Sequence, residues 1–415
     1  MSRLSPDVSP GRRPRHPCPG RLGAVSAVLT KHPGHATRTF DTTTMIDNDP
    51  IPTAAPDFAS LERIGLNPAL RRSVMQALMD SDTHSLQPLR VTEVQRAQVL
   101  LHDGHDTRPA RLLPELAREL DETHDAIAAG DWVLAAPDAQ GDLWVRRRVP
   151  PLNQIARRLH DGRDKVARAV IVANVDTALL TMGLDADFNL RRLDRYLALA
   201  RLASVDPLVV LTKADLRRDV DGRLDAVRAM LPPLAQAIAV NGLDAVATRA
   251  ALLPWLQPGH TLVLLGSSGA GKSTLTNALL GQATQDTGPV RDSDGRGRHT
   301  TTARTLHRLP QGACVIDTPG IRTLRLDTDE AGLVGAFDEV ATLAAQCRFR
   351  DCRHESEPGC AVRSALAPDR LKSFRKLARE ASRDSMTLLD RQRQHALWRQ
   401  RSRASRALQK ARERP

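Results

Sequence analysis

The sequence predicts a multidomain α/β protein: a small β-barrel, then a parallel sheet with helices, then a small helical module. Three observations carry this prediction. Short β-like runs separated by turn residues fill residues 86–150, and longer apolar runs alternate with amphipathic stretches over 160–325. Three of the five cysteines then crowd between residues 347 and 360. Evenly spaced short strands are typical of barrels, and strands alternating with helices are typical of parallel sheets.

Composition narrows the class of protein. A chain of 415 residues is long enough for several domains, and no run approaches the length of a membrane-spanning helix. Residues 1–30 lack the apolar core of a secretory signal, and five cysteines make no disulfide framework. We therefore expect a cytoplasmic protein with no membrane partner.

The net charge of +12 is concentrated at the C-terminal end. Residues 371–415 hold fourteen Lys and Arg against four Asp and Glu. This tail is either a solvated charged helix or a surface for a polyanion, and the scarcity of aromatic residues favours contact with backbone phosphates over base stacking.

The first 50 residues are rich in Pro, Gly, Arg, Ser and Thr and have no apolar periodicity, so we expect a disordered extension. Met45 opens a more ordinary start. Residues 1–44 are then either an upstream extension of the reading frame or, being rich in Arg and poor in acids, a transit peptide.

The barrel is expected from four runs, "LRVTEVQ", "AQVLLHD", "TRPARLL" and "GDWVLAA". The parallel sheet is expected from five, "AVIVANVD", "PLVVLTKAD", "AQAIAVN", "TLVLLGSS" and "GACVIDTPG", with a helix at "NLRRLDRYLALARL". A helical module follows over 326–375, and a basic helical tail over 376–415. Composition alone does not identify the type of barrel.

A phosphate-binding loop is predicted at "GSSGAGKS", residues 266–273, which lies between an apolar strand and a helix-like stretch. Its backbone N–H groups would face a phosphate chain, Lys272 would reach the β- and γ-phosphates, and Ser273 would ligate Mg²⁺. The candidate residues of this loop are Gly266, Ser267, Ser268, Gly269, Ala270, Gly271, Lys272, Ser273 and Thr274.

The base-reading motif "TKAD" comprises Thr212, Lys213, Ala214 and Asp215 and ends the apolar strand "PLVVL". The Asp215 carboxylate would accept hydrogen bonds from guanine, whereas adenine would leave it unpaired. The motif therefore predicts GTP and GDP as ligands.

"DTPG", residues 317–320, ends a further strand. Asp317 would hold Mg²⁺ through water, and the Gly320 N–H would sense the γ-phosphate. In the common small-GTPase order the phosphate loop comes first, but here the base motif precedes it. Since a parallel sheet tolerates this change of chain entry, we expect a circularly permuted GTPase, with the segment after DTPG coupled to the nucleotide switch.

The cysteine cluster reads "CRFRDCRHESEPGC", with Cys347, Cys352, His354 and Cys360 as candidate ligands. Three thiolates and one imidazole complete a tetrahedral site with no open position, which predicts one structural Zn²⁺.

In combination, these motifs resemble the ribosome small-subunit-dependent GTPase A family (RsgA) over roughly residues 86–375. The resemblance implies an OB-fold at 86–155, a circularly permuted GTPase domain at 160–325 and a zinc-binding domain at 326–375. Trp132 and Trp144 would be core or contact aromatics of the OB-fold, with core the favoured interpretation for both. It also implies a monomer that binds the 30S ribosomal subunit and 16S rRNA and hydrolyses GTP late in 30S maturation.

"GRGRHTTT", residues 295–302, resembles the family's switch I, so Thr301 or a neighbouring threonine would bind Mg²⁺ and the γ-phosphate. Ile321 stands where Ras-like proteins keep a water-orienting Gln. An apolar side chain cannot orient water, so the resemblance makes His299 the catalytic candidate; the other interpretation of His299 is a flexible exposed side chain.

Two rival functions remain open from the sequence. One is a P-loop ATPase or kinase with a structural zinc module and no dependence on ribosomes, which "TKAD" opposes. The other is a binding module that uses nucleotide only as a conformational switch, which Ile321 allows.

Overall fold

The structure is a computed structural model that describes residues 56–81, 85–160, 166–232, 234–282, 304–320 and 325–385, with a few positions beyond. The predicted disordered extension at 1–50 lies outside the described residues, as does nearly all of the basic tail beyond Ser385. Among the described helices, none has both the length and the apolar character needed to cross a membrane.

Two helices that the sequence did not predict precede the barrel, α1 (Phe58–Glu62) and α2 (Pro68–Met79). Each begins at a polar N-cap: Asp57 accepts from the Ser60 N–H, and Asn67 accepts from the Leu70 N–H at 2.9 Å. Both helices bury apolar side chains in the main core. The segment is therefore a packed part of the fold.

Five strands form the barrel: β1 (Gln87–Val94), β2 (Val99–His102), β3 (Thr107–Leu112), β4 (Trp132–Pro137) and β5 (Leu143–Arg148). Pairing runs β1–β2–β3–β5–β4 and returns from β4 to β1, which closes the barrel. Helix α3 (Pro114–Glu122) connects β3 to β4. Trp132 is fully buried, while half-buried Trp144 donates to Asp138 at 2.9 Å.

The prediction of "AVIVANVD" as a strand of the parallel sheet is wrong. Most of that run belongs to β7 (Val166–Ala173), which pairs antiparallel with β6 (Gln154–His160) in a separate hairpin. The sheet strand is the next apolar run, β8 (Thr177–Gly183), whose residues are all buried. Asn174, with a φ of 54°, lies in the turn that separates the two runs.

The central sheet has the order β10 (Gln236–Ala239), β9 (Asp206–Thr212), β8, β11 (Thr261–Leu265), β13 (Cys314–Asp317), β12 (Thr305–Arg308). The first five strands are parallel, but β12 runs antiparallel to β13, so the sheet is mixed. β12 also pairs with β1 of the barrel, which makes one continuous sheet of eleven strands.

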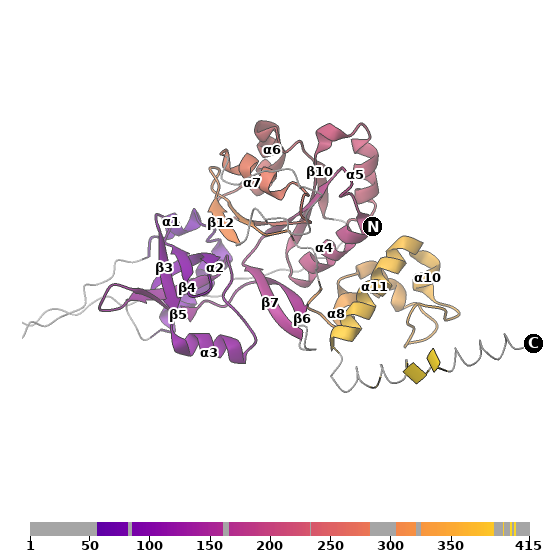
Figure 1. The fold of residues 1–415 in the computed structure, drawn as a ribbon, viewed down its shortest axis with the longest axis horizontal. Helices are drawn as coiled ribbons and strands as arrows, with labels where there is room; N and C mark the ends of the chain where they lie inside the picture. The colour runs from indigo at the N-terminus through magenta and orange to yellow at the C-terminus, as the bar shows by residue number, and fades with distance from the viewer. Residues whose placement is uncertain are drawn as a thin grey trace, which may run out of the picture. The chain divides into compact units, whose positions relative to one another are not determined.

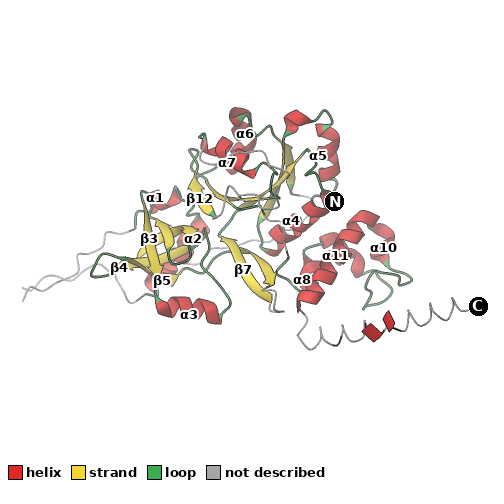
Figure 2. Cartoon of the chain, viewed as in Figure 1, coloured by secondary structure: helices red, strands yellow, loops and turns green. Residues whose placement is uncertain are grey.

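Helices flank this sheet: α4 (Leu190–Leu202), as predicted, α5 (Val220–Arg228), α6 (Ala245–Leu252) and α7 (Lys272–Leu280) (Figure 2). Single turns of 3₁₀-helix follow β9 (Ala214–Leu216) and α6 (Leu253–Trp255). Alternate residues of the buried strands enter two different apolar clusters, with Val263 in one and Leu262 in the other. Such burial on both faces explains the near-continuous apolar strands.

The C-terminal module consists of α8 (Glu330–Gly335), α9 (Asp338–Ala344), α10 (Ala361–Ala365) and α11 (Pro368–Ser385) (Figure 1). The Phe337 and Phe374 rings meet edge to face with centroids 5.4 Å apart. Arg195 of α4 pairs with Glu380 of α11 at 2.7 Å. The buried side chains of the module join the main core.

Candidate nucleotide and metal sites

The predicted nucleotide motifs lie at one edge of the sheet. β9 ends at Thr212, β11 leads into Gly266, and β13 ends at Asp317. Because these strands are parallel members of one sheet, their carboxyl ends meet at the same edge, where nucleotides bind in folds of this class.

The phosphate loop has a backbone that only glycine suits. Gly271 has a φ of 89°, and a Cβ on Gly266 would lie 2.4 Å from the Thr181 carbonyl oxygen. The Lys272 ammonium donates to the carbonyl oxygens of Gly266 at 3.1 Å and Ser267 at 2.8 Å. Burial lowers the pKa of Lys272, an effect that the nearby Asp317 carboxylate opposes. The loop thus forms a tight backbone cradle with one buried cation beside it.

The base-reading motif contacts the phosphate loop directly. The Thr212 hydroxyl donates to the Ala270 carbonyl at 2.6 Å, within the buried interior. Lys213, with a left-handed φ of 60°, donates through Nζ to the Gly269 carbonyl at 2.7 Å. Asp215 is exposed, in the short 3₁₀ turn that follows. Residues that are far apart in the sequence therefore form one continuous rim.

The DTPG loop completes that rim. Thr318 donates to the Leu264 carbonyl at 2.6 Å, which ties the loop to β11. A Cβ on Gly320 would lie 2.7 Å from the Ser268 nitrogen, so the two loops touch. Asp317 is 1% exposed. Its carboxylate and the Ser273 hydroxyl are hard oxygen donors of the kind that Mg²⁺ prefers, and both could hold that ion.

Two acidic residues of the site were missed by sequence reasoning. Asp185 and Asp187 follow β8, and Asp185 accepts from Lys213 Nζ at 2.6 Å. Asp187 accepts from the Ser267 hydroxyl and pairs with Arg192. Burial would raise the pKa of Asp185, but hydrogen bonds from Lys213 and from the Asp187 N–H outweigh it and hold the pKa below its usual value. The available signal was a pair of carboxylates directly after an apolar run.

Three predicted functional positions lie outside the described residues: His299, Thr301 (with its neighbours at 300 and 302) and Ile321. The predictions made for them stay predictions.

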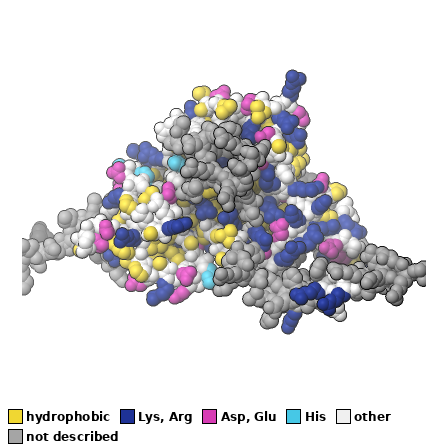
Figure 3. Space-filling model, viewed as in Figure 1, with side chains coloured by type: hydrophobic (Ala, Val, Ile, Leu, Met, Phe, Trp, Pro, Cys, Tyr) yellow, Lys and Arg dark blue, Asp and Glu magenta, His cyan; other side chains and the backbone are white. Residues whose placement is uncertain are grey.

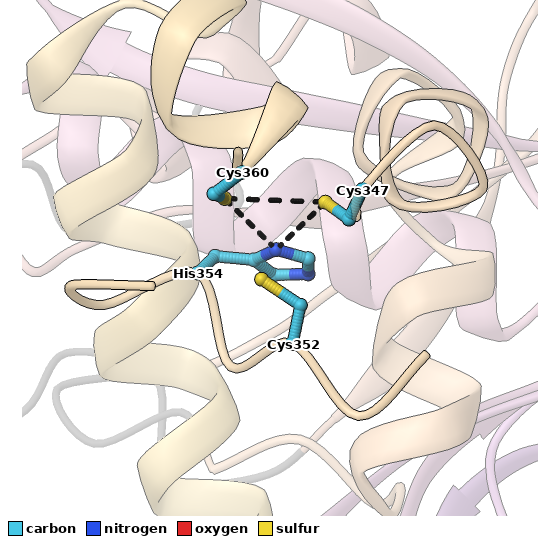
Figure 4. Close-up of side chains that lie close together, drawn as sticks. All are labelled: Cys347, Cys352, His354 and Cys360. Atoms are coloured by element: carbon cyan, nitrogen blue, oxygen red, sulfur yellow. Dashed lines mark hydrogen bonds between the residues drawn. The ribbon is translucent and has the colours of Figure 1, made fainter. Parts of the chain in front are cut away.

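The four predicted metal ligands come together in the C-terminal module. Their ligand atoms all lie within 4.8 Å of one another, and Figure 4 shows the side chains of Cys347, Cys352, His354 and Cys360 converging. Cys347 Sγ lies 3.9 Å from Cys360 Sγ, and His354 Nδ1 lies 3.6 Å and 3.4 Å from those two sulfurs.

A tetrahedral zinc site with Zn–S bonds of about 2.3 Å puts its sulfurs about 3.8 Å apart. The observed spacing fits that geometry. His354 is 7% exposed and has a left-handed φ of 58°, and Cys360 caps α10 by accepting from the Arg363 N–H. The cluster can therefore hold a metal ion in a closed site.

Comparison with known proteins identifies relatives of this chain. Residues 152–327 match the RsgA GTPase family. The chain is 43% identical over 340 residues to the small ribosomal subunit biogenesis GTPase RsgA of Xanthomonas axonopodis pv. citri, covering 79% of this chain and 90% of that protein. It is 46% identical over 304 residues to the protein of the same name from Xylella fastidiosa strain 9a5c, covering 71% and 85%.

Two solved structures share the fold. YjeQ from Thermotoga maritima aligns with a TM-score of 0.52 at 23% identity, covering 71% of this chain and 98% of that one. YloQ, described as a circularly permuted GTPase, aligns with a TM-score of 0.50 at 21% identity, covering 74% and 98%. The base-first order of motifs thus occurs on a known architecture.

Proposed function

The chain belongs to the RsgA GTPase family, and from this premise we propose that it acts in the biogenesis of the small ribosomal subunit. It is a GTP hydrolase that converts GTP and water to GDP and phosphate. The observation that carries the proposal is the contact between the base-reading loop and the phosphate loop through Thr212 and Lys213. One ligand that spans both loops has a guanine at one end and phosphates at the other.

The TKAD, phosphate and DTPG loops would bind different parts of GTP. Asp215 pairs with the guanine donors and so excludes ATP, because adenine would leave the carboxylate unpaired. The backbone N–H groups of residues 266–272 bind the phosphates at the N-terminus of α7, with Lys272 as the cation. Ser273 would hold Mg²⁺ directly, Asp317 would hold it through water and Thr301 would be a further ligand; the bound ion would neutralise charge on the phosphates.

The attacking water is oriented by His299, since Ile321 has no polar group to do so. Turnover by the chain alone is therefore slow, and docking on the 30S subunit orders switch I and brings His299 to the water. Basic residues beyond Ser385 contact 16S rRNA phosphates. The Cys/His cluster holds one structural Zn²⁺, and the chain acts as a cytoplasmic monomer.

GTP turnover with and without purified 30S, 50S and 70S particles tests this function. We expect strong stimulation by 30S that weakens as salt rises, because phosphate contacts release counterions. His299→Ala should keep GTP-dependent binding to 30S and lose the stimulated rate. Equal stimulation by 50S particles, or none by 30S, would contradict the proposed function.

The role of the basic tail in 30S binding can be tested by a deletion that leaves α11 intact. Leu377 and Ala381 of α11 are buried, so a cut at residue 376 would damage the module. Removal of residues 386–415 avoids this. It should weaken affinity for 30S and leave the affinity for GDP unchanged.

A further inference from the structure

The loop between two of the metal ligands carries an unusual tip. Residues 348–351, Arg-Phe-Arg-Asp, join Cys347 to Cys352, and all four are exposed. Phe349 is 41% exposed and is the one aromatic ring among the exposed large apolar side chains of the described residues. The chain has eleven Phe, Trp and Tyr residues in all, so an exposed aromatic ring at this point is a candidate contact for a ligand.

The backbone around this tip is held firmly. The Arg348 N–H donates to the Gly359 carbonyl at 3.0 Å, and the Cys352 N–H donates to the Phe349 carbonyl at 3.3 Å. The Glu357 carboxylate accepts from the backbone N–H groups of Arg353, Glu355 and Ser356. A hydrogen bond from its own backbone N–H, together with these three, lowers the pKa of Glu357 to about 2. A metal bound by Cys347 and Cys352 would fix both ends of the loop. Phe349 is therefore presented on a preorganised support.

The ring has positively charged neighbours. The Arg348 guanidinium carbon lies 5.5 Å from the Phe349 centroid. In the described part of the chain, no carboxylate lies within ion-pair distance of Arg348, Arg350 or Arg353. Asp351 is the one acid within the tip, and the Glu357 carboxylate is occupied by backbone donors.

The module adds further positive charge near this loop. Arg375 of α11 donates to the Glu355 carbonyl at 3.1 Å, which brings that helix against the ligand-bearing segment. Lys372, Lys376 and Arg379 of α11 are exposed. On the face in Figure 3, Lys and Arg side chains gather over α4 and α11.

We propose that this tip binds single-stranded RNA, with Phe349 stacked on an unpaired base and Arg348 and Arg350 contacting the flanking phosphates. A flat apolar ring bordered by guanidinium groups matches a nucleobase bordered by phosphodiesters. Unpaired bases are available in RNA loops and bulges, whereas a duplex hides them. A protein partner would need a wider apolar patch around the ring to exclude water. Here the neighbours of Phe349 in sequence are Arg348 and Arg350, and the Arg348 guanidinium lies against the ring. The inference rests on the proposed function, and it names a contact between this chain and the RNA of the 30S subunit.

The test compares Phe349→Leu, Phe349→Trp and wild type for binding a short mixed-sequence single-stranded RNA and an RNA duplex. Leu keeps an apolar side chain and removes the ring, so affinity for the single strand should fall about tenfold. Phe349→Trp keeps an aromatic ring, so this variant should bind the single strand as tightly as wild type does. Leu253→Ala, at an exposed apolar residue in a different element, should bind as wild type does. Zinc content and intrinsic GTP turnover should be the same in all four proteins.

The outcomes separate the inference from the proposed function. Wild-type affinity in Phe349→Leu, or an equal loss on single strand and duplex, overturns the stacking contact. A 30S binding defect in Phe349→Leu that naked RNA does not reproduce also overturns it, in favour of a ribosomal protein as partner. If wild type is not stimulated by 30S particles while the ring-dependent binding of single strands holds, the proposed function fails and the inference stands.

Discussion

Lys213 links the two halves of the nucleotide site through a single ammonium group. It donates to the Gly269 carbonyl of the phosphate loop and to the Asp185 carboxylate, both at less than 3 Å. The backbone at Lys213 is left-handed, with a φ of 60°. We therefore propose that Asp185 is a positioning residue, which would act on the nucleotide through Lys213.

Asp185→Asn should weaken the binding of both GDP and GTP by about threefold to fivefold, because a partly exposed ion pair is worth about 1 kcal/mol or less. The turnover number at saturating GTP should not change. Titration with a fluorescent GDP analogue measures the affinity. Asp206→Asn is the matched control, since it removes an exposed carboxylate at the opposite end of β9. A change in the turnover number, with affinity unaltered, would contradict the positioning role.

At the scale of elements, we expect a metal bound by the Cys/His cluster to fix the conformation of the segment between α9 and α10. This segment has few buried apolar side chains of its own, whereas the helices around it bury Phe337, Val340 and Phe374 in the main core. Loss of metal should therefore loosen the segment without unfolding the helices.

One equivalent of zinc should co-purify with the protein, and Cys352→Ser should lose it. Hydrogen exchange should rise over residues 347–360, while GDP affinity changes less than twofold. Cys314→Ser is the control: that thiol is buried in β13, away from the cluster, and burial raises its pKa to about 11. Retention of full zinc by Cys352→Ser would rule out this residue as a ligand.

Elements differ in how well the sequence predicted them. The fold class and the helix at α4 are confirmed, because long amphipathic or fully apolar runs have a clear period. The strand at "AVIVANVD" was wrong because two apolar runs, β7 and β8, stand three residues apart, and only tertiary pairing decides which one joins the sheet. Asp185 was missed because its role depends on a lysine from another strand. Motifs therefore identified the loops of the site, whereas an individual contact such as Lys213 to Asp185 depends on how the strands pair.

At the scale of the whole molecule, the segment after DTPG is tied to three other parts. Only four residues separate Gly320 from Arg325. Asp327 accepts from Arg158 at 3.2 Å and from Arg168 at 2.8 Å, both in the β6–β7 hairpin. Arg168 also pairs with Asp125, between α3 and β4, and Arg325 pairs with Asp384 of α11. These ion pairs therefore join the chain just after the DTPG loop to the β6–β7 hairpin and to α11, and through Arg168 to the segment that precedes β4.

Asp327→Ala should uncouple the nucleotide site from the particle. We expect intrinsic turnover and 30S binding close to wild type, with stimulation reduced severalfold. Combining Asp327→Ala with Arg168→Ala should cost less than the sum of the two single losses, because both variants remove the Asp327–Arg168 pair. Asp225→Ala, which breaks an exposed pair on α5, is the control. Full stimulation of Asp327→Ala, measured as phosphate release, would show that coupling takes another route.

The permuted order of the motifs also sets the order in which the parts of the nucleotide site are synthesised on a ribosome. Within the central sheet, β8, β9 and β10 are synthesised first, so the guanine-reading loop leaves the ribosome before the phosphate loop has been synthesised. β11 must then enter between β8 and a strand not yet made, and β12 and β13 close the sheet last. The pairing of β12 with β1 means that the barrel also gains its final neighbour at that step. A nascent chain therefore has no complete nucleotide site until residue 320 has left the exit tunnel, and binding of nucleotide marks a chain whose sheet is finished.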